Sequence, residues 1–522
     1  MYDILKEPIV SVRLGSVAKV ADLAQVLAWM SAGHEVAFTA LQPHQHHPWH
    51  AFLVQLAALA CARASVGDLP TEPETWRAAL LALTAGDSAP WHLVVDDLSK
   101  PALLQPPVPE GNLDNFKTLI PTPDGLDILL TTRNFDIKAQ RIVHPTPEHW
   151  LFALITKQTF EGYSGKSNYG IFRMNGGQSN RPCVAVAPDL SWARRFRRDV
   201  HVWLAERQNL LENHAYDPKG HALLWLLPWN GTDSLKRTSL DPFFIEVCRR
   251  IRLQRDGEGI LARMATSEKQ RISATEHAGA TGDIWTPFQL EGKKGVPAAL
   301  TVPATGFTYK KLADVLFGDA WTDWPRRRPQ PDDGPTPLVI AQALVRGQGK
   351  TEGYHQRIIP IPTKARGMLA RREGLERLGA LSRLRIERVA FVRDRVLKPA
   401  ICTLLQGATA DKLDFRDQRA TPWLERFEQR VDDRFFPALF DAVDADGDQA
   451  PRLAWDEELE GFARKTFFEE ALLEVPVPIA HRYRVRAAAE STFYGSSAKV
   501  FEELREHRKT VKSAESESAA EV

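Results

Sequence analysis

The sequence predicts an α+β protein in which a large, irregular mixed α/β domain precedes an antiparallel four-helix bundle. Up to about residue 360, short apolar runs alternate with helical patterns and with Pro- or Gly-rich loops. From residue 364 onward, four long segments with helical apolar spacing follow one another. The final residues are small and polar, which is typical of a disordered tail. The expected divisions are therefore 1–360, 361–510 and 511–522.

Individual helices of the first domain follow from local patterns. Residues 48–64 are apolar almost all round, which predicts a buried helix. Thr71 and Glu74 match a capping box at the start of the next helix. Thr146 and Pro147 match a helix cap followed by a first-turn proline, and so predict a further helix from that point.

The overall composition is that of a folded protein without extreme charge. The chain has 522 residues, with 67 Lys and Arg against 66 Asp and Glu, which argues against a uniformly basic nucleic-acid binder. The four cysteines are far apart in sequence, so neither a disulfide framework nor a cysteine zinc site is expected. No signal-peptide pattern and no uncharged run of bilayer length is present, so we expect a cytoplasmic location.

Charge is nevertheless uneven along the chain. Between Val345 and Ala400 there are 14 basic residues and only 5 acidic ones, whereas the bundle from about residue 411 leans acidic. A basic first bundle helix on a nearly neutral protein is the local pattern expected of a polyanion-binding surface.

The segment "GQGKT", residues 347–351, resembles the end of a phosphate-binding loop. The full motif requires a glycine at position 344, which is Leu344, and a helix after the loop, whereas "EGYHQRIIPIP" contains two prolines and no helical period. A Walker B-like stretch, "HLVVDD" (92–97), lies far upstream. The loop is interpreted either as an exposed polar turn or as a turn that approaches nucleic acid through its backbone and Lys350. Nucleotide hydrolysis using Lys350 is the enzymatic alternative.

Four histidines, His44, His46, His47 and His50, cluster in "HQHHPWH". Imidazoles bind metals, but no carboxylate or cysteine lies near them in sequence, and Pro48 separates the pair that a helix would align. A solvated turn is favoured over a metal site.

Other motifs give equally little support to catalysis. In "DADGD" (444–448) a calcium loop would place Ala442 and Leu453 where Asp and Glu are needed, so an inter-helix turn is favoured. The runs "RRFRR" (194–198) and "RRR" (326–328) are interpreted as solvated faces. We find no signature of a catalytic triad, and expect no enzyme activity, no catalytic residue and no cofactor.

Several segments, taken in order, carry a resemblance to a known family. They are "ILKEPIVSVRLGSVAKVADLAQVL", "LQPHQHHPWHAFLVQLAALA", "DILLTTRNFDIKAQRI", "LITKQTFEGYSGKSNYG" and "GDIWTPFQL", followed by the bundle. With these segments the sequence resembles the CasA family, the large subunit of the type I-E CRISPR Cascade surveillance complex.

The resemblance implies a non-catalytic DNA- and RNA-binding subunit of an antiviral ribonucleoprotein complex. Such a subunit recognises a protospacer-adjacent motif in duplex DNA, starts R-loop formation and helps recruit a helicase–nuclease. The implied partners are the backbone, small-subunit and guide-end proteins of Cascade, the CRISPR guide RNA, double-stranded target DNA and the helicase–nuclease, without a membrane. A scaffold that binds only protein neighbours is the alternative from another class.

The resemblance also assigns roles to particular residues. Motif recognition falls on a glycine loop and a lysine finger: Gly162, Tyr163, Ser164, Gly165, Lys166 and Lys269. The strand-separating wedge falls on Gln348, Gly349 and Lys350. Contact with the guide RNA falls on Asn134, Phe135, Asp136 and Lys138. Displaced-strand binding falls on Arg366, Arg371 and Arg372 of the first bundle helix. The segment "GQGKT" departs from a wedge made of glutamines or asparagines, and the cysteine pair that some members carry is absent, so no structural zinc is expected.

Overall fold

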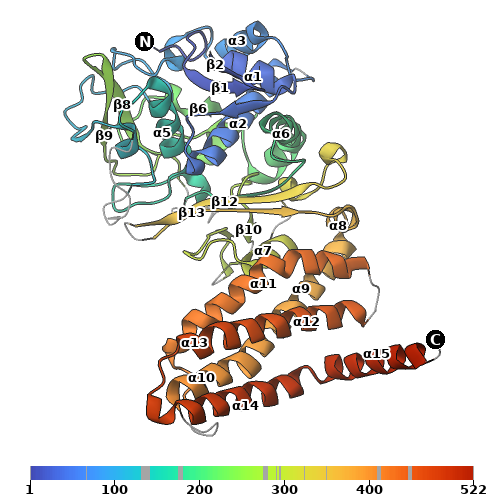
Figure 1. The fold of residues 1–522 in the computed structure, drawn as a ribbon. Helices are drawn as coiled ribbons and strands as arrows, with labels where there is room; N and C mark the ends of the chain where they lie inside the picture. Colours follow the sequence, from blue (N-terminus) through green and yellow to red (C-terminus); the bar gives the residue numbers. More distant parts are fainter. Residues whose placement is uncertain are drawn as a thin grey trace. The chain divides into compact units, whose positions relative to one another are not determined.

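The computed structural model shows two compact units (Figure 1). The first comprises Met1–Phe307 and Asp319–Ile361, and the second Thr308–Gly318 and Pro362–Val522. The division after Ile361 lies one residue from the expected boundary, but the sequence did not predict that residues 308–318 join the second unit. The structure describes residues 2–65, 67–130, 142–174, 180–273, 280–289, 291–292, 295–321, 324–347, 350–407, 413–444 and 449–520.

The described part of the first unit contains several small sheets instead of one large one. Their strand orders are β2-β1-β3, β13-β12-β5, β4-β9-β8, β6-β7 and β10-β11. The strands are β1 (Val10–Leu14), β2 (Val17–Ala21), β3 (Val36–Phe38), β4 (Thr118–Ile120), β5 (Cys183–Ala187), β6 (His221–Leu223), β7 (Leu240–Ile245), β8 (Arg250–Asp256), β9 (Gly259–Ala265), β10 (Phe288–Gln289), β11 (Ala298–Ala299), β12 (Leu338–Arg346) and β13 (Thr351–Pro360). The mixed, irregular α+β class is confirmed.

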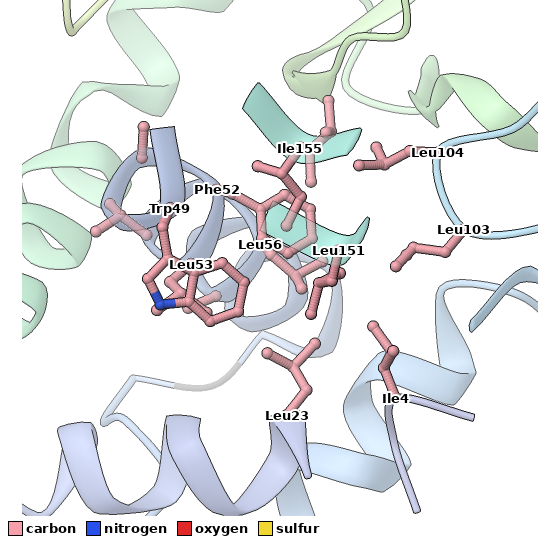
Figure 2. Close-up of a cluster of buried hydrophobic side chains, with 14 of the residues drawn as sticks. Ile4, Leu23, Trp49, Phe52, Leu53, Leu56, Leu103, Leu104, Leu151 and Ile155 are labelled. Atoms are coloured by element: carbon pink, nitrogen blue, oxygen red, sulfur yellow. The ribbon is translucent and has the colours of Figure 1, made fainter. Parts of the chain in front are cut away.

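Helices of the first unit supply many of the buried core residues, together with residues of the strands. These helices are α1 (Leu23–Ser31), α2 (His46–Ala64), α3 (Pro73–Ala82), α4 (Pro123–Leu126), α5 (Pro147–Phe160) and α6 (Trp192–His214). Figure 2 shows Trp49, Phe52 and Leu56 of α2 packed near Leu151 and Ile155 of α5. Full burial of each such side chain contributes about 1.5–3 kcal/mol, so the all-round apolar pattern of α2 places this helix at the centre of the core.

One predicted helix cap is confirmed and the other is wrong. Thr146 is the N-cap of α5, with Pro147 as its first residue. At α3 the N-cap is Glu72 and its side chain makes no capping bond, because Pro73 occupies the first helical position and moves the helix start past Thr71.

The predicted solvated histidine turn is wrong. His44, His47 and His50 are 2%, 3% and 1% exposed. Pro48 lies in the first turn of α2, where proline is tolerated, so the helix begins at His46 and carries His47 and His50 inward. His44 lies in the 3-10 turn that precedes α2, Pro43–Gln45. His44 and His50 each contact a buried carboxylate, Asp127 at 2.7 Å and Asp199 at 2.8 Å.

Each of the two arginine runs is partly buried. Arg198 donates to Asp333 at 2.7 Å and to Asp199 at 3.2 Å. Arg326 donates to Asp199 at 2.6 Å and lies 3.8 Å above the centroid of a Trp285 ring. Because both runs contribute to the surroundings of the buried Asp199, the expectation of solvated faces is wrong for Arg198 and Arg326, and also for the buried Arg327. The expectation is confirmed for the exposed residues of the runs, which are Arg194, Arg197 and Arg328.

Two further sequence expectations concern short segments. Residues 92–97 form no Walker B-like strand; only an isolated bridge joins His92 to Asp3. Residues 445–448 of the calcium-like segment lie outside the described residues. The four cysteines are buried free thiols.

The second unit is a bundle of long helices, as the sequence predicted (Figure 1). Its elements are α7 (Tyr309–Phe317), α8 (Thr363–Leu369), α9 (Arg372–Val392), the π-helical turn η9 (Arg393–Leu397), α10 (Lys398–Gln406), α11 (Thr421–Asp441), α12 (Ala450–Arg464), the π-helical turn η13 (Lys465–Ala471), α13 (Leu472–Glu474), α14 (Arg482–Val500) and α15 (Glu502–Ala520). The expected tail from residue 511 overlaps the end of α15, which the structure continues to Ala520. None of the described helices has the length and apolar character needed to cross a bilayer.

Candidate nucleic-acid interface

The glycine loop leaves the end of α5 and returns close to its own start. Gly162 is buried and donates its N–H to the Asn180 side chain at 3.3 Å. A Cβ on Gly170 would overlap the backbone of Gly162, so only glycine permits the two ends to approach so closely. Ser164 and Lys166 are exposed at the tip. The loop therefore has a fixed base and an accessible tip.

A buried carboxylate, Glu161, lies directly beneath this loop. Its oxygens accept hydrogen bonds from Arg249 at 2.7 Å, Arg346 at 2.8 Å and Lys157 at 3.0 Å, and its side chain is 1% exposed. Burial alone would raise the pKa of Glu161, but the charges of Arg249, Lys157 and Arg346 outweigh burial and hold the pKa well below its usual range. This ionic cluster joins α5 to the end of β12 and to the residue that precedes β8.

The same cluster reaches the loop itself. Arg249 also donates to the Ser164 hydroxyl at 2.9 Å. The Ser164 N–H donates to Asn168 O at 3.0 Å, and Asn168 N–H donates to Gly165 O at 2.9 Å, which closes a tight turn. The conformation of residues 164–168 is thus set by backbone bonds and by one buried arginine.

The turn that carries Lys269 is bonded to the glycine loop. Ser267 N–H donates to Ser167 O at 3.1 Å, and the Tyr169 hydroxyl donates to Glu268 O at 3.0 Å. The N–H groups of Glu268 and Lys269 share one acceptor, Gly231 O, at 2.8 and 3.1 Å. The exposed Lys269 and the exposed Lys166 therefore belong to one surface, which we call the loop surface (residues 162–169 and 267–269).

The tip of the β12–β13 hairpin carries the predicted wedge. Gly347 N–H donates to Lys350 O at 2.8 Å, while Gln348 and Gly349 lie outside the described residues. Lys350 is 54% exposed and pairs with Glu352 at 3.2 Å. Arg346, at the end of β12, is the residue that pairs with Glu161, so the hairpin and the loop surface share one buried anchor.

The hairpin geometry disagrees with a phosphate-binding loop. The ten residues from Thr351 form strand β13, whereas a phosphate-binding loop opens a helix whose N-terminus holds the anion. Within the described residues, no group of three or more His, Cys, Asp or Glu side chains has the arrangement of a metal site.

Solved structures identify the fold on which these loops are arranged. Thermobifida fusca Cse1 matches 97% of this chain and 98% of its own, at 15% identity and a TM-score of 0.67. The CRISPR-associated protein Cse1 from Acidimicrobium ferrooxidans matches 96% and 99%, at 13% identity and a TM-score of 0.62. Thermus thermophilus CasA (Cse1) matches 95% and 99%, at 14% identity and a TM-score of 0.61. The chain has the CasA (Cse1) fold.

The fold implied by the sequence resemblance is thus confirmed. No protein-family model and no curated protein matches the sequence. The likeness to CasA is one of backbone arrangement over nearly the whole chain, with identity too low to transfer residue roles.

The predicted site residues lie in different parts of the structure. The loop surface and the hairpin tip are brought together in the first unit by Glu161. The four residues expected to contact guide RNA, at 134–136 and 138, lie outside the described residues. The three arginines expected to bind the displaced strand belong to the second unit.

Those arginines do not share one helix, which corrects the sequence prediction. Arg366 is in α8, Arg371 is the N-cap of α9 in extended conformation, and Arg372 is the first residue of α9. The chain turns here because Gly374 lets α9 pass close to the Met368 backbone, which a Cβ would overlap. Arg371 and Arg372 are both exposed.

Sequence reasoning missed the residues that hold the loops in place. Glu161, Arg249 and Arg346 are separated by up to 185 positions, and no local pattern links them. The one available signal was the position of Glu161 between a predicted helix and the glycine loop.

Proposed function

We propose that this chain is the large, non-catalytic CasA-type subunit of an RNA-guided DNA surveillance complex. The observation that carries the proposal is the CasA fold over 95–97% of the chain. The bonded loop surface supports it, because two cationic tips predicted from distant segments lie on one face. Guide-RNA pairing supplies most sequence specificity in such complexes, so the protein needs only to recognise a short duplex motif.

The loop surface is assigned to recognition of that motif. The minor groove is narrow and shows a degenerate donor and acceptor pattern, so a small loop with exposed backbone suits it better than a helix. The loop supplies residues 162–166, and Lys269 adds a donor and a charge. The ionic cluster at Glu161 keeps the loop in shape before DNA binds.

The hairpin tip at Gln348, Gly349 and Lys350 is assigned to strand separation. Parting one base-pair step costs a few kcal/mol, which new contacts to the separated strands offset. Because Arg346 anchors the hairpin to the same carboxylate as the loop surface, motif recognition and strand separation start from one rigid base.

The remaining roles concern partners. Arg366, Arg371 and Arg372 bind phosphates of the displaced strand. The segment containing Asn134, Phe135, Asp136 and Lys138 contacts the guide RNA. The chain assembles with the backbone, small-subunit and guide-end proteins of Cascade and helps recruit a helicase–nuclease in the cytoplasm.

Reconstitution with the other subunits and a guide RNA tests the proposal. The Lys269→Ala variant should assemble normally but form R-loops poorly on targets that carry the motif. The Gly170→Ala variant should also form R-loops poorly, because the added Cβ displaces the loop from the Gly162 backbone. The matched control is Gly367→Ala in α8, where a Cβ would meet no atom within 4 Å. Normal R-loop formation by both loop variants would show that the loop surface does not recognise the motif.

The same preparation separates the alternatives. Nucleotide turnover by the purified chain that disappears in Lys350→Ala would favour the NTPase. Equal DNA affinity of complexes with and without this subunit would favour a protein-binding scaffold.

A further inference from the structure

A groove of about 860 Å³ lies on the second unit, between α9, α12 and the junction of α14 with α15. Leu381 and Leu384 of α9 and Trp455 of α12 give it an apolar wall. Leu384 is 64% exposed, although it occupies a position on the helix that faces the groove. An apolar wall of several residues, rimmed by charged side chains, is typical of an interaction site.

A buried arginine also lines this groove. Arg385 is 6% exposed, and its Nη1 has no hydrogen-bond partner among the described residues. Its Nη2 donates to the Pro451 carbonyl at a long 3.5 Å, and its guanidinium lies 5.0 Å from the centroid of a Trp455 ring. Burial lowers the pKa of Arg385 to about 10. The negative charges of Glu458, Asp441 and Asp456 raise this pKa, but by less than burial lowers it. A buried cation without a close counter-ion is costly, and an incoming carboxylate would remove that cost.

The other charges of the groove are mostly paired. Arg388 holds Asp456 through two hydrogen bonds of 2.7 Å, and Arg452 pairs with Glu503. The exposed carboxylates of Glu502 and Glu506 also line the groove, together with the exposed cations Arg377 and Lys499.

This charge pattern selects the kind of ligand. A chain of phosphates has no apolar side chains to place on Leu381 and Leu384, and the carboxylates of Glu502 and Glu506 would repel it. A polypeptide segment can instead present a carboxylate to Arg385, apolar side chains to Leu381 and Leu384, and a cation to Glu502 or Glu506. The groove therefore fits a protein segment better than a nucleic acid.

We infer that this groove binds a segment of a partner protein that places one carboxylate on Arg385, apolar side chains on Leu381, Leu384 and Trp455, and a basic side chain beside Glu502 or Glu506. The inference rests on the proposed function in that the partner is one of the protein subunits of the assembled complex.

A photo-crosslinking residue at position 384 of the full-length chain tests this inference in the complex reconstituted with guide RNA. The matched control is the same residue at position 473, because Leu473 is 66% exposed and does not line the groove. The expected result is a crosslink from position 384, absent from position 473, to one segment of a protein subunit that carries apolar, acidic and basic side chains. Crosslinks to nucleic acid, or none in a fully assembled complex, would overturn the inference. Failure of the wild-type chain to assemble would overturn the proposed function itself.

Arg385→Met separates binding from folding. Loss of a charged hydrogen bond should weaken the affinity of this chain for the rest of the complex about 10- to 100-fold. The thermal midpoint of the isolated chain should stay the same or rise, since an unpaired buried charge is removed. A lower midpoint with unchanged affinity would show that Arg385 serves the fold alone and would refute the groove.

Discussion

Two groups of arginines, one in each unit, form opposite kinds of ion pair. In the first unit, Arg249 and Arg346 are held by Glu161, whose side chain is 1% exposed. In the second unit, Arg372 pairs with Glu376 one turn further along α9, and the two side chains are 92% and 57% exposed. The ion pairs of Glu161 join segments that are far apart in sequence. The pair of Arg372 with Glu376 lies on the surface of a single helix.

This difference sets what each group of cations can do. Removal of one partner from a buried ion pair costs about 3–5 kcal/mol, because an uncompensated charge remains. An exposed pair contributes about 0–1 kcal/mol and exchanges partners readily. Buried arginines therefore fix the loops of the first unit, whereas exposed ones in the second unit are available to outside phosphates.

The largest expected effect comes from Glu161→Gln. It leaves Arg249, Arg346 and Lys157 without their shared buried carboxylate, so the free energy of unfolding should fall by about 3–5 kcal/mol. Denaturant titration of the full-length chain measures it. The matched control is Glu376→Gln beside Arg372, which should cost less than about 1 kcal/mol. Similar decreases in the unfolding free energy of both variants would show that the buried and the exposed ion pairs contribute equally to stability.

The pH dependence of stability gives the next largest effect. Burial lowers the pKa of His50 from its usual value of 6.5 to about 4, with Arg195 adding to the shift and Asp199 opposing it. As the pH falls below 6.5 the unfolded chain binds the proton first, so stability is present above that pH and is lost as the pH approaches 4.

Between pH 7 and pH 5 this histidine should therefore cost about 2 kcal/mol of stability. His46 and His47 act in the same direction, because burial lowers the pKa of both rings. Unfolding free energies at the two pH values, compared with those of His50→Gln, isolate the contribution of His50. An equally steep dependence in the variant would assign it to other groups.

Local patterns predicted much of the fold. The helix at 48–64 and the start of α5 at Thr146 were predicted because apolar period and capping chemistry act over a few residues. The long bundle helices followed from the same periodicity. The glycine loop was placed at the end of a helix, where the structure has it.

Long-range pairs could not be predicted in this way. The pairing of Glu161 with Arg249 and Arg346 spans 88 and 185 positions. The histidines were predicted to be solvent-exposed, because no feature of the neighbouring sequence indicates that Asp127 and Asp199 are their partners. A single sequence shows which residues are charged but not which of them the fold brings together.

Exposed arginines of the second unit should affect DNA binding without affecting folding. Replacement of Arg371 and Arg372 by alanine should reduce the slope of log affinity against log salt by about 0.7 for each phosphate of the single strand that is no longer neutralised. The affinity should fall to a similar extent for all sequences. Filter binding of the reconstituted complex over a salt series measures this, and a decrease confined to particular sequences would argue against phosphate binding.

The smallest expected effect is a gain in stability within the bundle. Gly461 lies inside α12, and a Cβ there would meet no atom within 4 Å. Gly461→Ala should therefore raise the free energy of unfolding by about 0.5–1 kcal/mol, because glycine loses more backbone freedom on folding than alanine.

The control for this gain is Gly379→Ala in α9, where a Cβ would lie 2.7 Å from the Phe317 carbonyl oxygen. That substitution should destabilise the chain, since the backbones of α7 and α9 would have to separate. The thermal midpoints of both variants of the full-length chain measure these effects. They distinguish the open position at Gly461 from the closely packed position at Gly379. If Gly461→Ala also lowers stability, the exposed face of α12 at this position is constrained, and the expected gain from alanine there is wrong.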